Sequence, residues 1–370
     1  SGGDSYSGDT FFDYNTTFNN SGTVDSQSGV LFFDHGSDSG TVNVAANAVF
    51  VSQACTLAGS PTFTGPGSLQ GFYNGNNAVL NGLMMFNNAT LSGTLTLASN
   101  AVANLTSVFN SPVSFNAVVF TNYGAINWGG VNLSGNSAQI YNYGLWDAQT
   151  NNTLAGGSGT TTTFNNFGTF RKSGGDPNSG ATLLDFNVIF NNAGMADSQN
   201  GQLAILGSYS LAGGKLNFGI NSSNDLGTIH LAGNATLTGT LGVNLNHNYA
   251  PTAGSSFPVL TYDSETGAFT DLKLPSGLSW QTNYGATTFT LSVSAVLPAQ
   301  LSVTEGGNNT ISFAWNAVPG QTYQVQYTTN LPSTNWISLG GVITVTNETV
   351  SVSDAVNADP QRFYRVVFTQ

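Results

Sequence analysis

The sequence contains few charged residues, and most of these are acidic. Asp, Glu, Lys and Arg make up only 6% of the 370 residues, where a typical globular domain has roughly a quarter. The 18 acidic residues outnumber the 6 basic ones, so the formal net charge is −12. Nucleic acids and anionic membrane surfaces are bound through clustered Lys and Arg, so this composition argues against both as partners.

Cysteine and long apolar runs are also scarce. Cys55 is the single cysteine, so the chain has no internal disulfide and no zinc site of the usual cysteine spacing. Its neighbours Ala54 and Leu57 indicate a buried thiol rather than a reactive one. No apolar stretch reaches the length of a membrane-spanning helix, so we expect no membrane insertion.

Composition also suggests where the protein works. No signal peptide is visible at Ser1, which we interpret as a processed or engineered start. Low charge and low cysteine content, together with repeats rich in Asn, Thr and Gly, are typical of secreted bacterial proteins. We therefore expect an extracellular or cell-surface protein.

A five-residue motif recurs along the chain: an apolar residue, a polar residue, Asn, any residue and Gly. The copies are residues 18–22, 120–124, 140–144, 164–168 and 190–194, with a degraded copy at 86–90. The consecutive asparagines Asn122, Asn142, Asn166 and Asn192 are 20, 24 and 26 residues apart. A strand-like repeat of roughly 20–30 residues without helical periodicity is typical of a stacked solenoid.

The motif also predicts which side chains face inward. Side chains of a strand alternate between its two faces, so the apolar first residue, the Asn and the residue two after the Gly can share the inner face. Stacked Asn side chains can hydrogen-bond to one another along the solenoid axis. The sequence therefore predicts an asparagine ladder of Asn20, Asn122, Asn142, Asn166 and Asn192. We expect the Gly to allow a turn or bulge.

The third residue after each Gly is expected to face solvent. In three consecutive repeats it is Asp147, Arg171 and Asp197. If the coils stack in register, Arg171 lies between the two carboxylates, which predicts a surface charge ladder. Such exposed ion pairs stabilise a fold by about 1 kcal/mol or less each.

The region after residue 238 resembles the end of autotransporter-passenger-like parallel β-helix proteins of bacteria. The resemblance is carried by residues 239–245 (Gly-Thr-Leu-Gly-Val-Asn-Leu), 251–262 (Pro-Thr-Ala-Gly-Ser-Ser-Phe-Pro-Val-Leu-Thr-Tyr) and 284–293, which begin with Tyr-Gly-Ala-Thr and end with Leu-Ser-Val. In that family this segment closes the solenoid. The resemblance therefore implies a C-terminal cap from about residue 250, which would cover the apolar end of the last coil.

The last seventy or so residues resemble a fibronectin type III or other immunoglobulin-like sandwich. The features that carry the resemblance are Trp315, the Tyr-x-Val-x-Tyr pattern at 323–327 and the Phe-Tyr-Arg-Val strand within 362–368. In the family one more strand follows this last one, whereas here the sequence stops at Gln370. Either the sandwich has one strand fewer or an edge stays open for a strand from another chain.

Together these patterns predict an all-β protein. We expect a right-handed parallel β-solenoid (β-helix) of roughly a dozen coils, followed by a small antiparallel β-sandwich. The predicted domains are an N-terminal segment at 1–17, available as an assembly strand, the solenoid with its cap at 18–296, and the sandwich at 297–370. Leu297 and Pro298 form the predicted linker.

No catalytic, cofactor or metal site is expected. The histidines, His35, His230 and His247, lie far apart, and no Asp-Asp pair suited to an inverting glycosidase occurs. The basic pair Arg171-Lys172 could serve a polysaccharide lyase if it lined a groove with several Asp, but a charge ladder is the favoured interpretation. The six Asp of the first fifty residues could bind calcium, although their spacing favours solvated turns.

The leading functional hypothesis is a non-enzymatic structural protein, either an adhesive stalk or a filament subunit joined head to tail with itself. The residues predicted to take part in assembly are Thr10, Phe11, Phe12, Tyr14, Phe363, Tyr364, Val366 and Phe368. A carbohydrate-binding adhesin is the first alternative, and it predicts a row of exposed aromatic residues drawn from Tyr123, Trp128, Tyr141, Tyr143 and Trp336. A polysaccharide lyase or hydrolase on a β-helix is the second.

Overall fold

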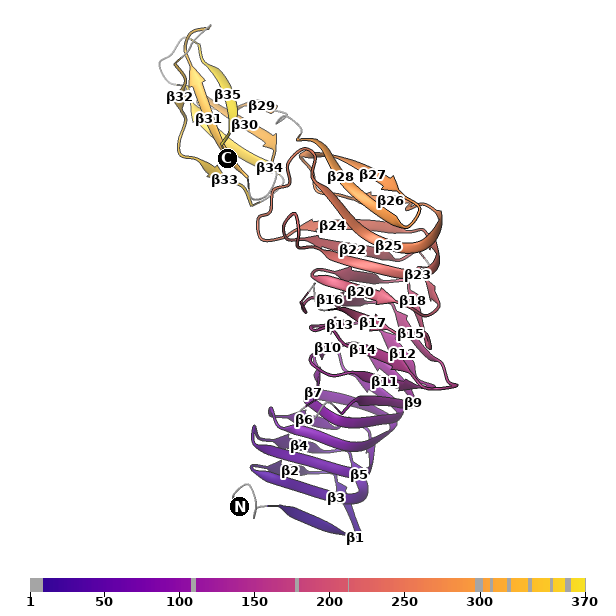
Figure 1. Ribbon diagram of the computed structural model, residues 1–370. Helices are drawn as coiled ribbons and strands as arrows, with labels where there is room; N and C mark the ends of the chain where they lie inside the picture. Colours follow the sequence, from indigo (N-terminus) through magenta and orange to yellow (C-terminus); the bar gives the residue numbers. More distant parts are fainter. Residues whose placement is uncertain are drawn as a thin grey trace. The chain divides into compact units, whose positions relative to one another are not determined.

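The computed structural model describes residues 9–107, 111–176, 180–211, 213–296, 302–306, 309–317, 321–331, 335–346, 349–356 and 361–369. Within these ranges all regular structure is β-strand, and no helix occurs. The strands stack into a parallel β-solenoid of about 11 turns, and small antiparallel sheets follow in the C-terminal part (Figure 1). The predicted fold class is thereby confirmed.

The chain divides into two compact units. The first comprises Ser1–Phe218, Gly227–Leu241 and Leu260–Leu272, and it contains most of the solenoid. The second comprises Gly219–Leu226, Gly242–Val259 and Lys273–Gln370. The predicted linker at 297–298 and the first eight residues lie outside the described ranges.

The first coils are built from long strands that bend across more than one side of the solenoid. β1 pairs with β3, β3 with β5, β5 with β7 and β7 with β9, all in parallel. Shifts of register, such as the one between Ser52 and Cys55, mark the bends. The strands of this part are β1 (Thr10–Asn20), β2 (Thr23–Ser26), β3 (Gly29–Asp38), β4 (Thr41–Val44), β5 (Ala48–Ala58), β6 (Thr62–Thr64) and β7 (Ser68–Leu97).

Because β1 pairs with β3 from Thr10 onward, the first coil begins at Thr10. The sequence placed the start of the solenoid at residue 18 and left 1–17 as a separate segment. That boundary is wrong for the described residues, since the backbone of Thr10–Phe12 is already paired with that of Leu31–Phe33.

The later coils are shorter and regular, with three strands in each. Equivalent strands of successive coils pair in parallel and in register, as in β12–β15–β18 and β13–β16–β19. These strands are β8 (Val102–Thr106), β9 (Val113–Asn122), β10 (Ala125–Trp128), β11 (Leu133–Asn136), β12 (Gln139–Asn142), β13 (Leu145–Ala148), β14 (Thr153–Gly156), β15 (Thr162–Asn166), β16 (Thr169–Lys172), β17 (Ala181–Leu184), β18 (Val188–Asn192), β19 (Met195–Ser198), β20 (Gly201–Ile205), β21 (Tyr209–Ser210), β22 (Lys215–Ile220) and β23 (Gly227–Leu237).

The interior of these coils is apolar and rich in aromatic rings. Phe164 packs edge-on against Trp146 at 5.0 Å and against Phe170 at 5.3 Å between ring centroids, and all three side chains are fully buried. Burying one such side chain stabilises a fold by roughly 1.5–3 kcal/mol. The apolar first residue of each motif therefore forms the core, as its position in the repeat predicts.

The glycine of the motif is required by close stacking of the coils rather than by a left-handed backbone. A β-carbon on Gly144 would lie 2.1 Å from the carbonyl oxygen of Gly124, and one on Gly168 would lie 2.3 Å from that of Gly144. A β-carbon on Gly194 would likewise lie 2.2 Å from the carbonyl oxygen of Gly168. Any side chain here would force neighbouring coils apart. The chain bends at each of these glycines, as expected, but it is the close stacking of the coils that requires a residue without a side chain.

The second unit contains antiparallel sheets. β27 pairs with β28, and one sheet has the order β29-β30-β34. In another sheet β31 pairs with β32, β33 and β35, and Trp315 and Tyr323 pack in a small core. The remaining strands are β24 (Thr240–Leu245), β25 (Ser256–Gly267), β26 (Asp271–Lys273), β27 (Leu278–Tyr284), β28 (Thr288–Val296), β29 (Ser302–Gly306), β30 (Thr310–Asn316), β31 (Thr322–Thr328), β32 (Ile337–Ser338), β33 (Ile343–Thr344), β34 (Thr349–Ala355) and β35 (Phe363–Thr369).

Candidate functional site

Four asparagines form a continuous hydrogen-bonded column inside the solenoid. Nδ2 of Asn122 donates to Oδ1 of Asn142 at 2.7 Å, Asn142 donates to Asn166 at 2.8 Å, and Asn166 donates to Asn192 at 2.7 Å. The second Nδ2 hydrogen of each donor reaches a backbone carbonyl of the next coil, for example Leu145 O at 3.0 Å. All four side chains are fully buried, and the column satisfies their polar groups except Asn122 Oδ1, which has no hydrogen-bond partner among the described residues.

A second, shorter column occurs near the N-terminal end, and it contains a residue that sequence reasoning missed. Nδ2 of Asn20 donates to Oδ1 of Asp38 at 2.9 Å, and the Gly40 N–H donates to the same oxygen at 3.0 Å. Residues 36–40 have an acid two before a glycine, a spacing that matches the motif and could have identified Asp38. Burial raises the pKa of this carboxyl above its usual value, and the bonds from Gly40 and Asn20 act against that rise.

The degraded copy at 86–90 is not a structural copy of the motif. Phe86 lies opposite Leu105, whereas the residue opposite Phe120 in the preceding coil is Leu95. Phe86 therefore occupies a different side of the solenoid from the other motif phenylalanines. The local sequence match does not reveal this, because β7 runs through 30 residues and crosses between sides.

The three charged residues of the predicted ladder lie in register on successive coils, but one of them is buried. Arg171 lies between Asp147 and Asp197 along β13, β16 and β19, and its Nε donates to Oδ2 of Asp197 at 2.8 Å. The prediction that all three face solvent is wrong for Asp197, which is only 2% exposed. Its carboxylate also accepts from Asn217 Nδ2 at 2.8 Å and from the Gln199 amide, so it is a buried, multiply hydrogen-bonded anion.

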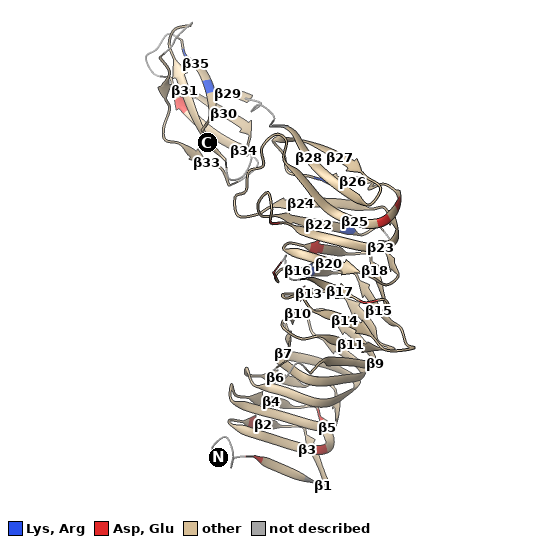
Figure 2. Cartoon of the chain, in the orientation of Figure 1, with Lys and Arg blue, Asp and Glu red and all other residues tan. Residues whose placement is uncertain are grey.

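Lys172, the neighbour of Arg171, points into the solenoid. Its side chain is fully buried, and among the described residues Nζ has no hydrogen-bond partner. Burial lowers the pKa of Lys172 to about 8, and the charge of Asp147 acts in the opposite direction. The basic pair thus does not line an open groove with several Asp, which was the arrangement that a lyase would require. Figure 2 shows how few charged residues the strands carry.

Three aromatic side chains form an exposed stack at the motif position between Asn and Gly. The ring centroids of Tyr123 and Tyr143 are 5.1 Å apart and those of Tyr143 and Phe167 are 4.9 Å apart, with interplanar angles of 17° and 12°. Each side chain is about half exposed. Since the rings cover one another's faces, only the outer faces of Tyr123 and Phe167 are open to a sugar ring. Trp128, by contrast, is fully buried.

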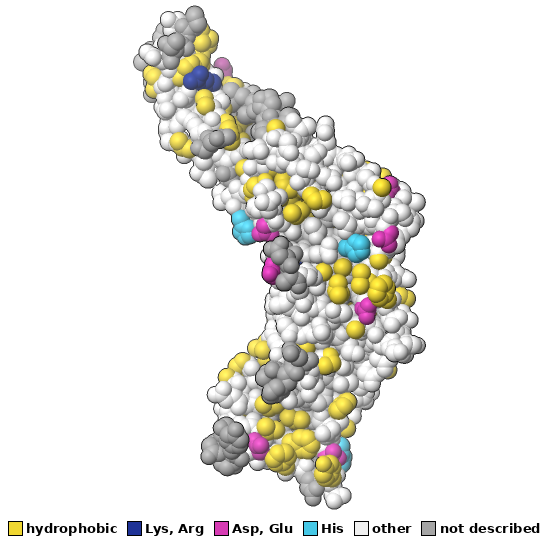
Figure 3. Space-filling model, in the orientation of Figure 1, with side chains coloured by type: hydrophobic (Ala, Val, Ile, Leu, Met, Phe, Trp, Pro, Cys, Tyr) yellow, Lys and Arg dark blue, Asp and Glu magenta, His cyan; other side chains and the backbone are white. Residues whose placement is uncertain are grey.

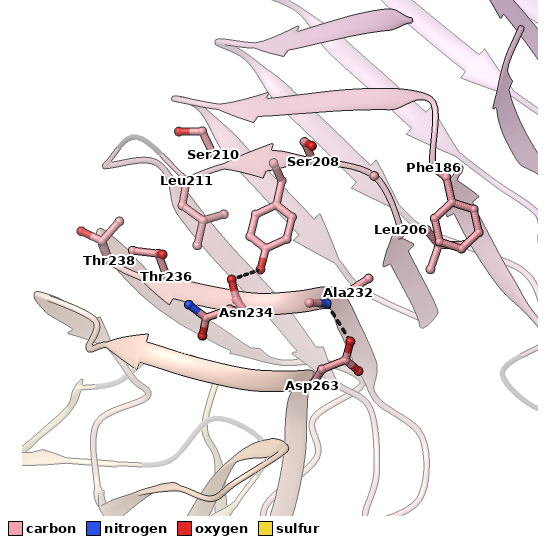
Figure 4. Close-up of a pocket in the computed structure, with 13 residues that line it drawn as sticks. Phe186, Leu206, Ser208, Ser210, Leu211, Ala232, Asn234, Thr236, Thr238 and Asp263 are labelled. Atoms are coloured by element: carbon pink, nitrogen blue, oxygen red, sulfur yellow. Dashed lines mark hydrogen bonds between the residues drawn. The ribbon is translucent and has the colours of Figure 1, made fainter. Parts of the chain in front are cut away.

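A groove opens on the solenoid where the parallel ladder is interrupted. β21 pairs with β18 over Tyr209 and Ser210 only, and among the described strands no pairing joins β21 to the following residues 234–237 of β23. Those residues pair instead with β25, after a register shift between Leu231 and Asn234. The coils therefore part here, leaving a cavity of about 850 Å³ (Figure 4).

Both walls of this groove carry polar groups, and one carries aromatic rings. Phe186 is 71% exposed at one side, and the Tyr209 hydroxyl reaches across to the Asn234 carbonyl at 3.4 Å. The Asp263 carboxylate accepts the Gly233 N–H at 2.9 Å (Figure 4). Burial, together with the charge of Asp263, raises the pKa of Tyr209 to about 12, so its hydroxyl stays protonated. Four hydroxyl side chains, Ser208, Ser210, Thr236 and Thr238, complete the polar lining.

The strand edges at the two ends of the described chain are open. β1 pairs only with β3, and its outer edge has no partner among the described strands; Phe11 on it is 65% exposed. β35 pairs only with β31, and Phe368 on it is 46% exposed. Of the other residues predicted for assembly, Thr10 and Tyr14 are exposed, and Phe12, Phe363 and Val366 are half-buried. Tyr364 turns inward, and its hydroxyl donates to Asp354 at 2.9 Å.

The remaining chemical candidates are structural as far as the described residues extend. Cys55 is buried, as expected, and burial together with the charge of Asp38 raises the pKa of its thiol to about 12. No group of three or more His, Cys, Asp or Glu is placed to hold a metal ion within the described part. Figure 3 shows only a few acidic and histidine side chains on one face, spread along the molecule, some of them side by side.

Comparison with known proteins finds no family model that matches the chain and no similar curated protein. A search of the described residues for a helix of sufficient length and hydropathy to cross a membrane also finds none.

Proposed function

We propose that the protein is a non-enzymatic extracellular structural protein that assembles head to tail with copies of itself. The observation that carries this proposal is the pair of open strand edges, β1 of the first unit and β35 of the second. Unpaired edges recruit strands from other chains, and an exposed Phe lies on each of these. A contact between two different edges is head to tail, so it repeats from copy to copy and gives a filament unless the rotation between copies closes a ring.

The resemblances seen in the sequence support this proposal. An autotransporter-like solenoid is typical of secreted proteins, and in the fibronectin-like part β35 has β31 as its partner among the described strands, so its other edge is available for pairing. This assembly differs from donation of the predicted segment 1–17 as a free strand, because Thr10–Phe12 already belong to a coil of the solenoid. The edge of that coil is what the next copy would extend.

The test is electron microscopy and sedimentation velocity of the full chain over a range of concentrations. The expected result is filaments, or oligomers that grow with concentration. Phe11→Lys and Phe368→Lys should each abolish assembly, because a charged side chain on the edge opposes strand addition. Phe72→Lys is the matched control, since Phe72 is 51% exposed but lies on β7, which is neither of the two edge strands. A monomer at every concentration, or unchanged assembly of Phe11→Lys, would reject the proposal.

Carbohydrate binding is the second candidate, and the groove between β21 and β23 favours it. Hydroxyl and amide side chains, one carboxylate and an exposed phenyl ring suit the hydroxyl groups and apolar faces of sugars. The exposed stack of Tyr123, Tyr143 and Phe167 is less suited to binding a sugar, because the rings cover most of one another's faces.

Affinity electrophoresis in gels containing a β-glucan, a mannan or a xylan tests this candidate. Retardation by one polysaccharide should be lost in Phe186→Ala and kept in Phe72→Ala, because only Phe186 lines the groove. Equal retardation of both variants would place any binding elsewhere.

A further inference from the structure

Lys172 is a buried amine without a described partner, in a position that a structural lysine rarely takes. It is the last residue of β16, and in register it lies between Ala148 of the coil before and Ser198 of the coil after. Neither neighbour is charged. Its side chain is fully buried, so the amine has no access to water.

The end of the Lys172 side chain lies beside the side chain of Asn151 from the preceding coil. A β-carbon built on Gly175 would lie 2.3 Å from Asn151 Oδ1, 2.6 Å from Lys172 Nζ and 2.9 Å from Asn151 Cγ, so the amine and the carboxamide border the same space next to Gly175. Gly175 has a φ of +104°, and its missing side chain leaves room for both groups. The carboxamide is held in place, because its Nδ2 donates to the Asp176 carbonyl at 2.8 Å.

We propose that Lys172 and Asn151 join in an intramolecular isopeptide bond that ties two successive coils of the solenoid together. The lone pair of the neutral amine attacks Asn151 Cγ, and the bond between Cγ and Nδ2 then breaks. The attacking nitrogen gives up a proton to the departing nitrogen, which leaves as ammonia. The product is a secondary amide between Nζ and Cγ, and the step needs no oxidant, reductant or co-reactant.

Two further properties of the site favour this reaction. A lysine at its ordinary pKa of 10.5 is almost wholly protonated near neutral pH, whereas burial lowers the pKa of Lys172 to about 8. Near pH 7 roughly a tenth of the Lys172 amine is therefore neutral and nucleophilic, far more than for an ordinary lysine. The carboxamide oxygen of Asn151 is also out of contact with solvent, which limits the approach of competing water from that side.

The bond would act as a cross-link between the coil that contains β13 and β14 and the coil that contains β16 and β17. Cross-links stabilise chiefly by restricting the unfolded chain. This inference is independent of the proposed assembly, because it concerns the interior of one chain.

Intact mass spectrometry of the purified full chain, denatured before measurement, tests the inference. The expected mass is lower than the sequence mass by one ammonia. Digestion with a protease that does not depend on lysine should yield a branched peptide containing both residues 151 and 172. Lys172→Met should restore the mass expected for its sequence, since Met fills a similar buried volume without an amine. Lys215→Met is the control and should keep the deficit.

Three results would overturn the inference. One is a chain at its full sequence mass, both when fresh and after prolonged incubation above pH 8. Another is a deficit that persists in Lys172→Met. The third is a branched peptide that joins other residues. Asn151→Ala provides a second variant, in which the deficit should also disappear if Lys172→Met fails to fold.

Discussion

Asn165 and Asn166 are neighbours in sequence but lie on opposite faces of β15. Asn166 accepts from Asn142 and donates to Asn192 and to the Met195 carbonyl inside the solenoid, whereas Asn165 accepts from Asn191 on the outside. Loss of the hydrogen bonds of Asn166 should therefore cost more stability than loss of those of Asn165. Water can replace a lost partner on the outside of the solenoid but not in its interior.

We expect Asn166→Ala to lower the free energy of unfolding by roughly 2–4 kcal/mol, because it leaves one Nδ2 hydrogen of Asn142 and the side-chain oxygen of Asn192 without their bonds to Asn166 in the core. Asn165→Ala should change it by about 0.5 kcal/mol or less. Urea denaturation followed by circular dichroism measures both. Equal effects of the two variants would show that the interior column is not a stabilising element.

Asp38 is the acidic member of the N-terminal column, and its replacement should stabilise the protein at neutral pH. Because burial raises the folded-state pKa, the stability linked to this carboxyl is present below its usual pKa of 3.8 and is lost as pH rises through the folded value. Asp38→Asn keeps an oxygen for the Asn20 and Gly40 donors and carries no charge. Its melting temperature should exceed that of the parent at pH 7, and the difference should vanish below pH 3.8. A difference that grows on acidification would contradict this account.

At the scale of strands, β16 and β19 share an ion pair that is more than a surface contact. The Arg171 side chain is 38% exposed, but the Asp197 carboxylate is 2% exposed. Removing the partner of a buried charge leaves that charge poorly compensated. We therefore expect the Arg171–Asp197 ion pair to stabilise the fold by more than the roughly 1 kcal/mol or less that is typical of an exposed pair.

Arg171→Gln should lower the free energy of unfolding by roughly 2 kcal/mol, in the range found for hydrogen bonds to buried charged groups. A double-mutant cycle with Asp197→Asn isolates the pairwise energy. The cycle should return a coupling well above the few tenths of a kcal/mol that are typical of exposed pairs. A coupling near zero would mean that Asn217 and Gln199 satisfy Asp197 without help from Arg171.

At the scale of the molecule, the net negative charge and the apolar strand edges have opposite effects on the association of copies. The net charge of −12 makes copies repel one another at long range, while the open edges carry exposed Phe side chains. Salt screens the repulsion and leaves apolar and backbone contacts largely unaffected. We expect assembly to strengthen when ionic strength rises from about 0.01 M to about 0.15 M, as the Debye length falls from roughly 30 to 8 Å. Sedimentation velocity at the two salt concentrations measures it, and weaker assembly at high salt would point to ion pairs at the contact.

The repeat motif by itself determined much of the fold. Phe164 and Asn166 two residues later are both buried in the core, as strand alternation requires, and the equivalent positions in successive motifs placed Arg171 between Asp147 and Asp197. Which residues face inward and which residues of successive coils lie opposite one another are local properties of a strand that stacks on its own repeat. The alternation of side chains along the strand, with a period of two residues, is enough to predict them.

Other features depend on contacts between coils, and the sequence alone did not reveal them. Phe86 has the motif but lies on another side, because the long β7 turns between sides. Asp197 is buried because neighbouring coils supply Arg171 and Asn217 around it, and Lys172 and Asn151, which lie on successive coils, border the same space next to Gly175. The groove at Tyr209 exists because two strands fail to pair. These features are set by how particular coils stack on one another in three dimensions, and the period-two pattern of a single strand does not encode them.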